Sequence, residues 1–244
     1  MEKVFIGWPD GGHNDSRFTK SLLDLQRFEL TQPDPSYELI DIDHQTSIYI
    51  QENRNTLVQV AQQLKADWML QLDGDESFDK TLLRQLMRTA LADKVNRLVV
   101  VGLYSNVANF GDGGMRGSFD VVDCIYAEHE NGAYVNVRPP DDLRPFCIDA
   151  AGTGVFLTHM SIYDKIEEPW YETAFIKPAG VDKFQFMNED LAFCRRIREA
   201  GFPIWCDPLA EVTHWKTLPL TPSSLRQFMA RARKAELEMS GRTS

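Results

Sequence analysis

The chain has 244 residues, of which 43% are hydrophobic, so it can bury the core of one large domain or of two small ones. Its 36 acidic and 26 basic residues give a formal net charge of -10. This charge argues against stable nucleic-acid binding, because proteins that bind the phosphate backbone usually carry a basic face.

Strand and helix patterns alternate through roughly the first hundred residues. The predicted strands are Lys3–Trp8, Tyr37–Asp43, Trp68–Leu72 and Arg97–Tyr104. Amphipathic helices are expected between them, with Asp15 and Asp79 as N-caps of the first and the last and Leu57–Leu64 inside the second. The last strand is apolar throughout, which is typical of a parallel sheet covered on both faces. This order predicts an α/β fold that binds ligands at the carboxyl ends of its strands.

The second half of the chain predicts shorter elements. They are a glycine-rich loop (110–118), a hairpin (120–140), a strand (149–159), a helix (188–201), short strands (203–215) and an amphipathic helix (221–239). Asn131 and Gly132 mark the hairpin turn, and Asn188 and Gly201 fit the cap and the stop of the helix. Since no repeat or linker is visible, we predict a single domain over residues 1–244.

The strand Trp68–Leu72 runs directly into Asp73, Gly74 and Asp75. Folding does not require two neighbouring carboxylates at a strand end, because like charges repel. One interpretation is a divalent-metal site, since carboxylate oxygens suit magnesium and manganese. A second is the nucleophile and acid pair of a haloacid-dehalogenase-type phosphohydrolase, with Asp73 as nucleophile. A third is a solvated turn, because Asp and Gly both favour turns.

Three segments in this order resemble a GT-A-fold glycosyltransferase of the family 2 type. They are RNTLVQVAQQLKADWMLQLDGDESF, GTGVFLTHMSIYDKI and NEDLAFCRRIREAGFPIWCDPLAEVTHW, and the resemblance extends over roughly Lys3–Trp215. It implies a Rossmann-like α/β/α sandwich with a nucleotide-sugar half (1–105), an acceptor half (106–220) and a C-terminal helix and tail (221–244). It also implies sugar transfer from a nucleoside diphosphate sugar, such as a UDP- or GDP-sugar, to a hydroxyl acceptor.

The resemblance implies a site for Mn²⁺ or Mg²⁺. Asp75 matches the direct metal ligand, and Asp73 matches the carboxylate that reaches the donor ribose or a metal-bound water. His214 matches a further metal ligand, although a histidine that merely ends a strand is the alternative. A shared site would bring a carboxylate oxygen of Asp75 within about 5 Å of a His214 nitrogen, because such ligand bonds measure about 2.0 to 2.6 Å.

The acidic pair Glu189 and Asp190 matches the residues that face the acceptor. The helix N-terminus would keep a carboxylate ionised there, as a general base requires. Asp190 is the preferred base, and the alternative is ordinary helix capping. Whether the anomeric configuration is inverted or retained stays open.

Further site residues follow from the same resemblance. The expected donor-binding residues are Pro9, Asp10, Asp43, Arg54 and Asp73. The expected acceptor-binding residues are Gly152, Thr153, Gly154 and Trp170. Arg54 could instead be solvated, Trp170 could be a core residue, and Asp41 with Asp43 forms a second Asp-x-Asp that competes for the metal. The other histidines (His13, His44, His129 and His159) are expected to be structural.

The remaining features bear on compartment and on the rival functions. The N-terminus lacks the apolar stretch of a signal peptide, no run approaches the roughly 18 apolar residues of a membrane span, and no C-x-x-C pair occurs. We therefore expect a cytoplasmic protein with reduced, mostly buried cysteines. Besides the phosphohydrolase, the rival is a sugar- or nucleotide-binding module without catalysis.

Overall fold

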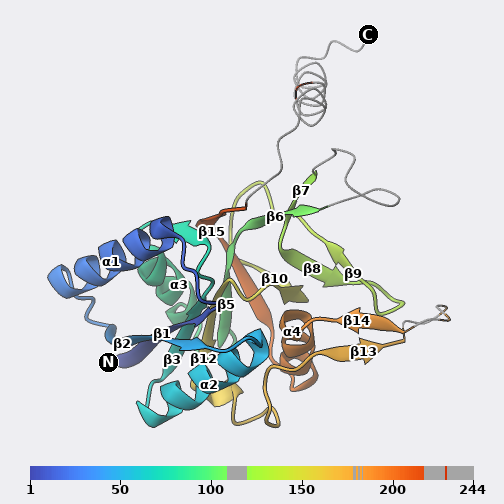
Figure 1. Cartoon of the computed structure of the whole chain (residues 1–244), viewed down its shortest axis with the longest axis horizontal. Coiled ribbons are helices and arrows are strands. Elements are labelled where there is room, and N and C mark those ends of the chain that lie inside the picture. The colour runs from blue at the N-terminus through green and yellow to red at the C-terminus, as the bar shows by residue number, and fades with distance from the viewer. Residues whose placement is uncertain (109–119, 178–179, 181, 183, 217–228, 230–244) are drawn as a thin grey trace. The chain divides into compact units, whose positions relative to one another are not determined.

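The computed structural model describes residues 1–108, 120–177, 180, 182, 184–216 and 229 (Figure 1). The chain forms two compact units. The first comprises Met1–Tyr104 and Asp123–Trp215, and the second comprises Ser105–Val122 and Lys216–Ser244. In the described part of the second unit, β6 (Ser105–Ala108) pairs with β7 (Asp120–Asp123). The predicted loop 110–118 and nearly all of the predicted helix 221–239 lie outside the described residues.

The first unit is built on an eight-stranded sheet with the order β10-β15-β5-β12-β3-β1-β2, and β4 pairs with β15 beside this path. Its strands are β1 (Glu2–Asp10), β2 (Tyr37–Thr46), β3 (Trp68–Leu72), β4 (Glu76–Phe78), β5 (Val99–Leu103), β10 (Phe146–Ile148), β12 (Val155–His159) and β15 (Ile204–His214). β1 is parallel to β2 and β3, and β5 is parallel to β15. β12 lies antiparallel between β3 and β5. The α/β prediction is confirmed. β5 was expected to lie in a parallel sheet, but it pairs antiparallel with β12.

Helices cover both faces of this sheet (Figure 1). They are α1 (Ser16–Thr31), α2 (Ile50–Gln63), α3 (Leu82–Leu91) and α4 (Glu189–Glu199), with a short 3-10 turn, η1 (Met160–Ile162). Apolar residues of α1 and α3 share one buried cluster with β1 and β3, and those of α2 and α4 share another. Phe18 and Leu25 of the first predicted helix are fully buried, as their spacing indicates.

Two smaller sheets complete the first unit. One contains β8 (Ile125–Glu128), β9 (Tyr134–Asn136) and β11 (Ala150–Ala151), and the other contains β13 (Ala174–Ile176) and β14 (Gln185–Met187). The predicted hairpin turn lies between β8 and β9, where Gly132 has a φ of 83°. This backbone conformation favours glycine.

Three of the four predicted helix boundaries are confirmed. Asp15 accepts a hydrogen bond from the Arg17 N–H, Asn188 accepts one from the Leu191 N–H, and Gly201 follows α4 with a φ of 88°. The fourth is wrong by two residues, because α3 begins after Thr81. Asp79 instead accepts hydrogen bonds from the N–H and the hydroxyl of Thr81, forming a turn before the helix.

Within residues 203–215 the structure has one long strand, β15, rather than the predicted short ones. β15 runs for 11 residues, and its pairing with β5 shifts register between Cys206 and Glu211. Pro208 lies in this irregular part, where it has no N–H to donate to a partner strand. The buried carboxylate of Asp207 accepts hydrogen bonds from Gln85 and Thr89 of α3, at 2.8 and 2.5 Å, so α3 is fixed to β15.

The sequence also predicted reduced, mostly buried cysteines and the absence of a membrane span. All four cysteines are free, and only Cys147 is exposed. Within the described ranges, none of the helices has the length and apolar character needed to cross a membrane.

We expect Gly102→Ala to lower the free energy of unfolding by about 1–3 kcal/mol, the usual cost of overpacking a core. A Cβ at Gly102 would lie 2.5 Å from the Ala210 carbonyl oxygen and 2.7 Å from Val155 Cγ1, so the sheet would have to shift. Urea unfolding measures the change. Gly11→Ala is the control, since nothing lies within 4 Å of a Cβ there; equal losses in both variants would contradict the explanation.

Candidate active site

The acidic turn after β3 meets the end of β15 because β4 folds back onto that strand. Glu76 of β4 pairs in register with His214, the last residue of β15. The Asp73 N–H donates to the Gly154 carbonyl at 3.0 Å, and the Trp215 N–H donates to the Asp75 carbonyl at 2.9 Å. These backbone bonds bring together residues that are 139 positions apart in the chain.

Asp75 and His214 are in direct contact. Asp75 Oδ2 lies 3.1 Å from His214 Nε2, within the 5 Å expected from sequence. The His214 side chain is only 7% exposed, whereas that of Asp75 is 40% exposed. The ring of Tyr104 packs edge-on against the imidazole at 5.5 Å and fixes its plane. The pair therefore combines a largely buried imidazole with a carboxylate that solvent can reach.

This pair fits a divalent cation that is shared with a ligand. Neighbouring corners of an octahedral site with bonds of about 2.1 Å lie about 3.0 Å apart, close to the separation of Asp75 Oδ2 and His214 Nε2. Among the described residues, no group of three or more His, Cys, Asp or Glu side chains is arranged to hold a metal. Since Mg²⁺ commonly combines one or two carboxylates with substrate phosphates and several waters, a diphosphate and water would have to supply the remaining ligands.

Arg54 connects the acidic turn to α4. Its side chain is 1% exposed, and Nη2 lies 2.9 Å from Asp73 Oδ1 and 3.7 Å from Asp190 Oδ1. Nη1 donates to the Gln71 side chain at 3.4 Å and to the Thr153 carbonyl at 3.5 Å. Burial opposes the charge of Arg54, but Asp73 and Asp190 outweigh it and raise the pKa of the guanidinium. The solvated-arginine alternative is excluded, and the contacts of this guanidinium are with the protein's own carboxylates.

Asp190 occupies the first turn of α4 with its side chain 16% exposed. The Thr153 hydroxyl donates to Asp190 Oδ1. Burial raises the pKa of Asp190 to about 6, with Glu189 and Asp73 adding to the rise and Arg54 opposing it. Glu189 itself is buried. Asp190 is therefore held in one orientation in the first turn of α4, with a pKa suited to proton transfer near neutral pH.

Glu76 is a site residue that the sequence did not reveal. It is fully buried, and neither carboxylate oxygen has a hydrogen-bond partner among the described residues. Burial and then the charges of Asp73 and Asp75 raise its pKa well above the usual value. An acid directly after an acidic turn would ordinarily be solvated, and only the pairing of β4 with β15 buries this one.

The predicted acceptor glycines make room for the protein's own side chains. A Cβ at Gly152 would lie 1.8 Å from the Tyr104 hydroxyl oxygen, and one at Gly154 would lie 2.2 Å from Glu76 Oε1. Both glycines lie in the turn between β11 and β12, not inside a strand. Thr153 between them is fully buried, so its contact with Asp190 is a supporting one.

Trp170 has the surroundings of a core residue. It is 5% exposed, its indole N–H donates to the Tyr163 carbonyl at 2.9 Å, and its ring packs edge-on against that of Tyr163. We therefore leave it out of the proposed site.

The carboxyl ends of β1 and β2 gather several of the predicted donor-binding residues. Asp10, next to the half-buried Pro9, accepts hydrogen bonds from the Gly12 N–H at 2.7 Å and the Asn14 side chain at 3.2 Å. His44 Nε2 lies 3.9 Å from Asp10 Oδ2, and its ring stacks on Trp8 at 5.1 Å. His44, expected to be structural, lies at this strand end through these contacts.

The competing Asp-x-Asp lies on a different strand. Asp41 is exposed, and its carboxylate accepts a hydrogen bond from the Ile42 N–H; Asp43 accepts one from the His44 N–H. β2 is the edge strand, separated from β3 by β1. The two acidic pairs therefore do not share one strand end.

Comparison with known proteins shows the fold. No family model and no curated protein matches the sequence. The solved structure of GalNAc-T7 with UDP, GalNAc and Mn²⁺ is similar, with a TM-score of 0.56 and 11% identity over 92% of this chain and 47% of that one. The structure of A197 from STIV is also similar, with a TM-score of 0.49 and 13% identity over 91% of this chain and 97% of that one. The likeness to GalNAc-T7 shows that the chain has a GT-A-type α/β/α fold.

We expect Arg54→Met to lower the free energy of unfolding by about 3–5 kcal/mol near neutral pH, as breaking a buried ion pair does. Asp73 and Asp190 would then face each other without a cation. The pKa of Asp190 is already about 6 and would rise further. Because the folded state then binds more protons than the unfolded state, the loss should shrink as the pH is lowered.

Urea unfolding near pH 7 and near pH 5 measures both effects. Arg195→Met is the matched control, because it removes an exposed ion pair with Glu199 on α4. We expect it to cost about 0.5 kcal/mol or less at either pH. A loss in Arg54→Met that is as small as in the control, or that grows at low pH, would contradict the assigned contacts.

Proposed function

We propose that the protein is a divalent-metal-dependent glycosyltransferase that moves a sugar from a nucleoside diphosphate sugar to a hydroxyl acceptor. One observation carries the proposal: Arg54 joins Asp73, which follows β3, to Asp190, which begins α4. A carboxylate beside the Asp75–His214 pair is thereby linked to a candidate base. The GT-A-type fold supports this proposal, as does the presence of UDP and Mn²⁺ in the GalNAc-T7 structure.

The proposed reaction needs a base, and Asp190 has the properties of one. Its carboxylate would accept the proton of the acceptor hydroxyl while the hydroxyl oxygen bonds to the anomeric carbon. The bond from that carbon to the diphosphate breaks with its electron pair, and the nucleoside diphosphate leaves. Asp190 then returns the proton to solvent. Direct attack of this kind inverts the anomeric configuration; in a retaining reaction Asp190 would only orient the acceptor.

The other residues bind and position. The Thr153 hydroxyl and Arg54 hold Asp190 in place, and the ends of β1 and β2, with Asp10 and Asp43, would receive the nucleoside. A divalent cation held by Asp75 and His214, with Asp73 close by, would neutralise charge on the diphosphate leaving group.

The phosphohydrolase alternative requires Asp73 as a nucleophile. The Asp73 carboxylate is instead 2.9 Å from a buried guanidinium, which stabilises its charge and lowers its nucleophilicity. The alternative of a binding module without catalysis shares every contact described above, so only turnover separates it from the enzyme.

We expect UDP or GDP together with Mn²⁺ to raise the melting temperature, because a ligand that binds only the folded state stabilises it. At a hundredfold excess over Kd the gain is about 2.7 kcal/mol. Asp75→Asn should abolish the Mn²⁺-dependent part of the shift, whereas Asp142→Asn, which changes an exposed carboxylate of another ion pair, should retain it. Thermal unfolding with and without Mn²⁺ measures both.

Two results would count against this assignment. Rapid hydrolysis of an aryl phosphate without any effect of diphosphates would favour the phosphohydrolase. A normal diphosphate shift without detectable donor hydrolysis or transfer would favour the binding module.

We expect Asp190→Asn to lower the transfer rate by about 10² to 10⁴-fold, the usual contribution of a positioned general base. Donor and Mn²⁺ affinity should change little. Because the base acts when deprotonated and the pKa of Asp190 is about 6, the wild-type rate should rise with pH up to about that value and then level off. The variant should lose this limb.

Transfer rates across a pH series, with donor affinity measured separately, test this assignment. If rate and donor affinity fall together, Asp190 belongs to the donor or metal site. If the rate is unchanged, Asp190 only caps α4.

A further inference from the structure

The hairpin formed by β13 and β14 carries an exposed aromatic face. Phe175 and Phe186 are paired across the two strands with ring centroids 5.6 Å apart, and they are 70% and 61% exposed. Phe184, 68% exposed, is two residues before Phe186, and alternate residues of an extended segment point to the same face. The other face packs against the protein through the buried Met187. Figure 1 shows the hairpin on the outer side of α4, so three phenylalanines project from it into solvent.

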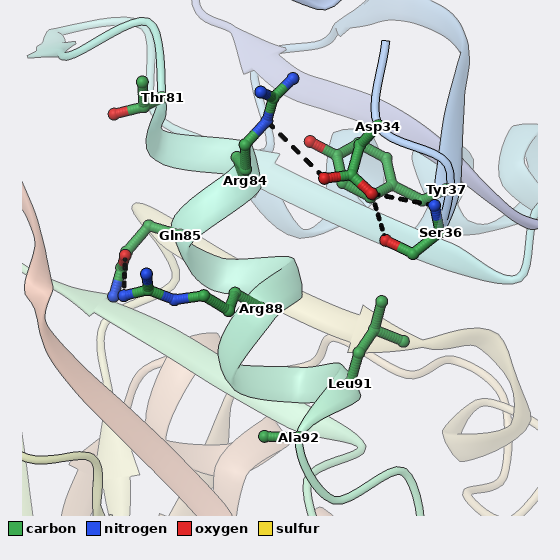
Figure 2. A pocket seen from close by; sticks show the side chains of 9 residues that line it. All are labelled: Asp34, Ser36, Tyr37, Thr81, Arg84, Gln85, Arg88, Leu91 and Ala92. Carbon is green, nitrogen blue, oxygen red and sulfur yellow. Dashed lines mark hydrogen bonds and ion pairs between the residues drawn. The ribbon is translucent and has the colours of Figure 1, made fainter.

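The pocket of about 600 Å³ beside α3 has a different character (Figure 2). Its arginines are engaged by groups of the protein itself. Arg84 lies 3.3 Å from Glu29 Oε2 and 3.9 Å from Asp34 Oδ2. Arg88 donates to the Gln85 side chain at 2.8 Å. The pocket therefore has little charge left for a ligand, whereas the hairpin leaves apolar surface in solvent.

The size of the aromatic face limits what it can bind. A buried aromatic side chain covers roughly 150–250 Å², so three that are about two thirds exposed present roughly 300–500 Å². A stable protein–protein interface buries about 800 Å² on each partner, so this face alone would not hold a second copy or another folded protein. A lipid bilayer requires no such minimum, because its fluid surface adapts to a few inserted side chains and binding scales with the apolar area buried.

The charges favour a bilayer without net charge. Residues 174–187 include only Lys177, Asp182 and Lys183 as charged residues, and the whole chain has a net charge of -10. An anionic membrane would repel the chain as a whole, and the hairpin has too few cations to compensate. Zwitterionic lipids let the phenylalanines insert without this repulsion.

We propose that the β13–β14 hairpin docks the protein on the surface of a zwitterionic lipid bilayer, with Phe175, Phe184 and Phe186 inserted among the lipids. Only Asn188 separates β14 from α4, so a docked hairpin would hold the start of α4 near the lipid surface. The docking does not depend on the proposed transferase reaction.

Flotation with phosphatidylcholine vesicles on a density gradient tests the docking, using the full chain without donor or metal. The protein should rise with the vesicles. Phosphatidylserine added to the vesicles should weaken the binding at low salt, and higher salt should restore it, because salt screens the repulsion.

Two serine variants and one conservative variant test the contacts. Phe184→Ser and Phe186→Ser should each weaken the binding about fivefold or more, because each removes apolar surface that the bilayer would bury. Phe184→Leu should retain most of the binding, since a bilayer requires apolar surface and not an aromatic ring, whereas a carbohydrate that stacks on the ring would be lost. Leu30→Ser is the matched control, because Leu30 is 75% exposed on α1, whose apolar residues belong to a different buried cluster from those of α4.

The outcomes divide as follows. Flotation of the wild type, with loss of binding in the serine variants at an unchanged melting temperature and none in Leu30→Ser, would establish the docking. Wild type that does not float, equal binding in the serine variants and the control, or binding that phosphatidylserine strengthens would overturn it. Loss of binding in Phe184→Leu as large as in Phe184→Ser, or dimerisation without lipid that Phe184→Ser abolishes, would assign the aromatic face to another partner and also overturn it.

Discussion

A single buried cation sets the geometry of the candidate site. Arg54 carries its charge at 1% exposure, which is tolerable only because Asp73 and Asp190 lie within 4 Å of Nη2. The three residues come from α2, the turn after β3 and the start of α4, so their pairing fixes these elements relative to one another. Buried ion pairs add little net stability but can specify one arrangement. Here that arrangement places Asp73, beside the proposed metal site, near Asp190, the proposed base.

The site remains short of positive charge despite Arg54. Asp73 and Asp190 share the Arg54 guanidinium, Asp75 contacts His214, and the buried carboxylate of Glu76 has no hydrogen-bond partner among the described residues. Carboxylates this close repel one another unless a proton or a cation intervenes. This crowding of carboxylates supports the proposed cation-binding arrangement after β3.

Periodicity predicted the helices that bury one apolar face and the strands that are one continuous apolar run. The apolar run Trp68–Leu72 is wholly buried, and the helical spacing around Leu57 gives α2. The family resemblance, applied to two strand ends, predicted that Asp75 and His214 lie together, as they do. The misses depend on pairing between distant segments: the antiparallel β12, the continuous β15 and the burial of Glu76 all follow from which strands become neighbours. Local patterns carry no information about that choice.

The same strand pairing also holds α3 in place. β15 ends at His214, and its buried Asp207 accepts hydrogen bonds from Gln85 and Thr89. Moving α3 would break two hydrogen bonds to a buried carboxylate, which is more costly than breaking neutral ones. α3 is therefore held against β15 in one position by its own side chains.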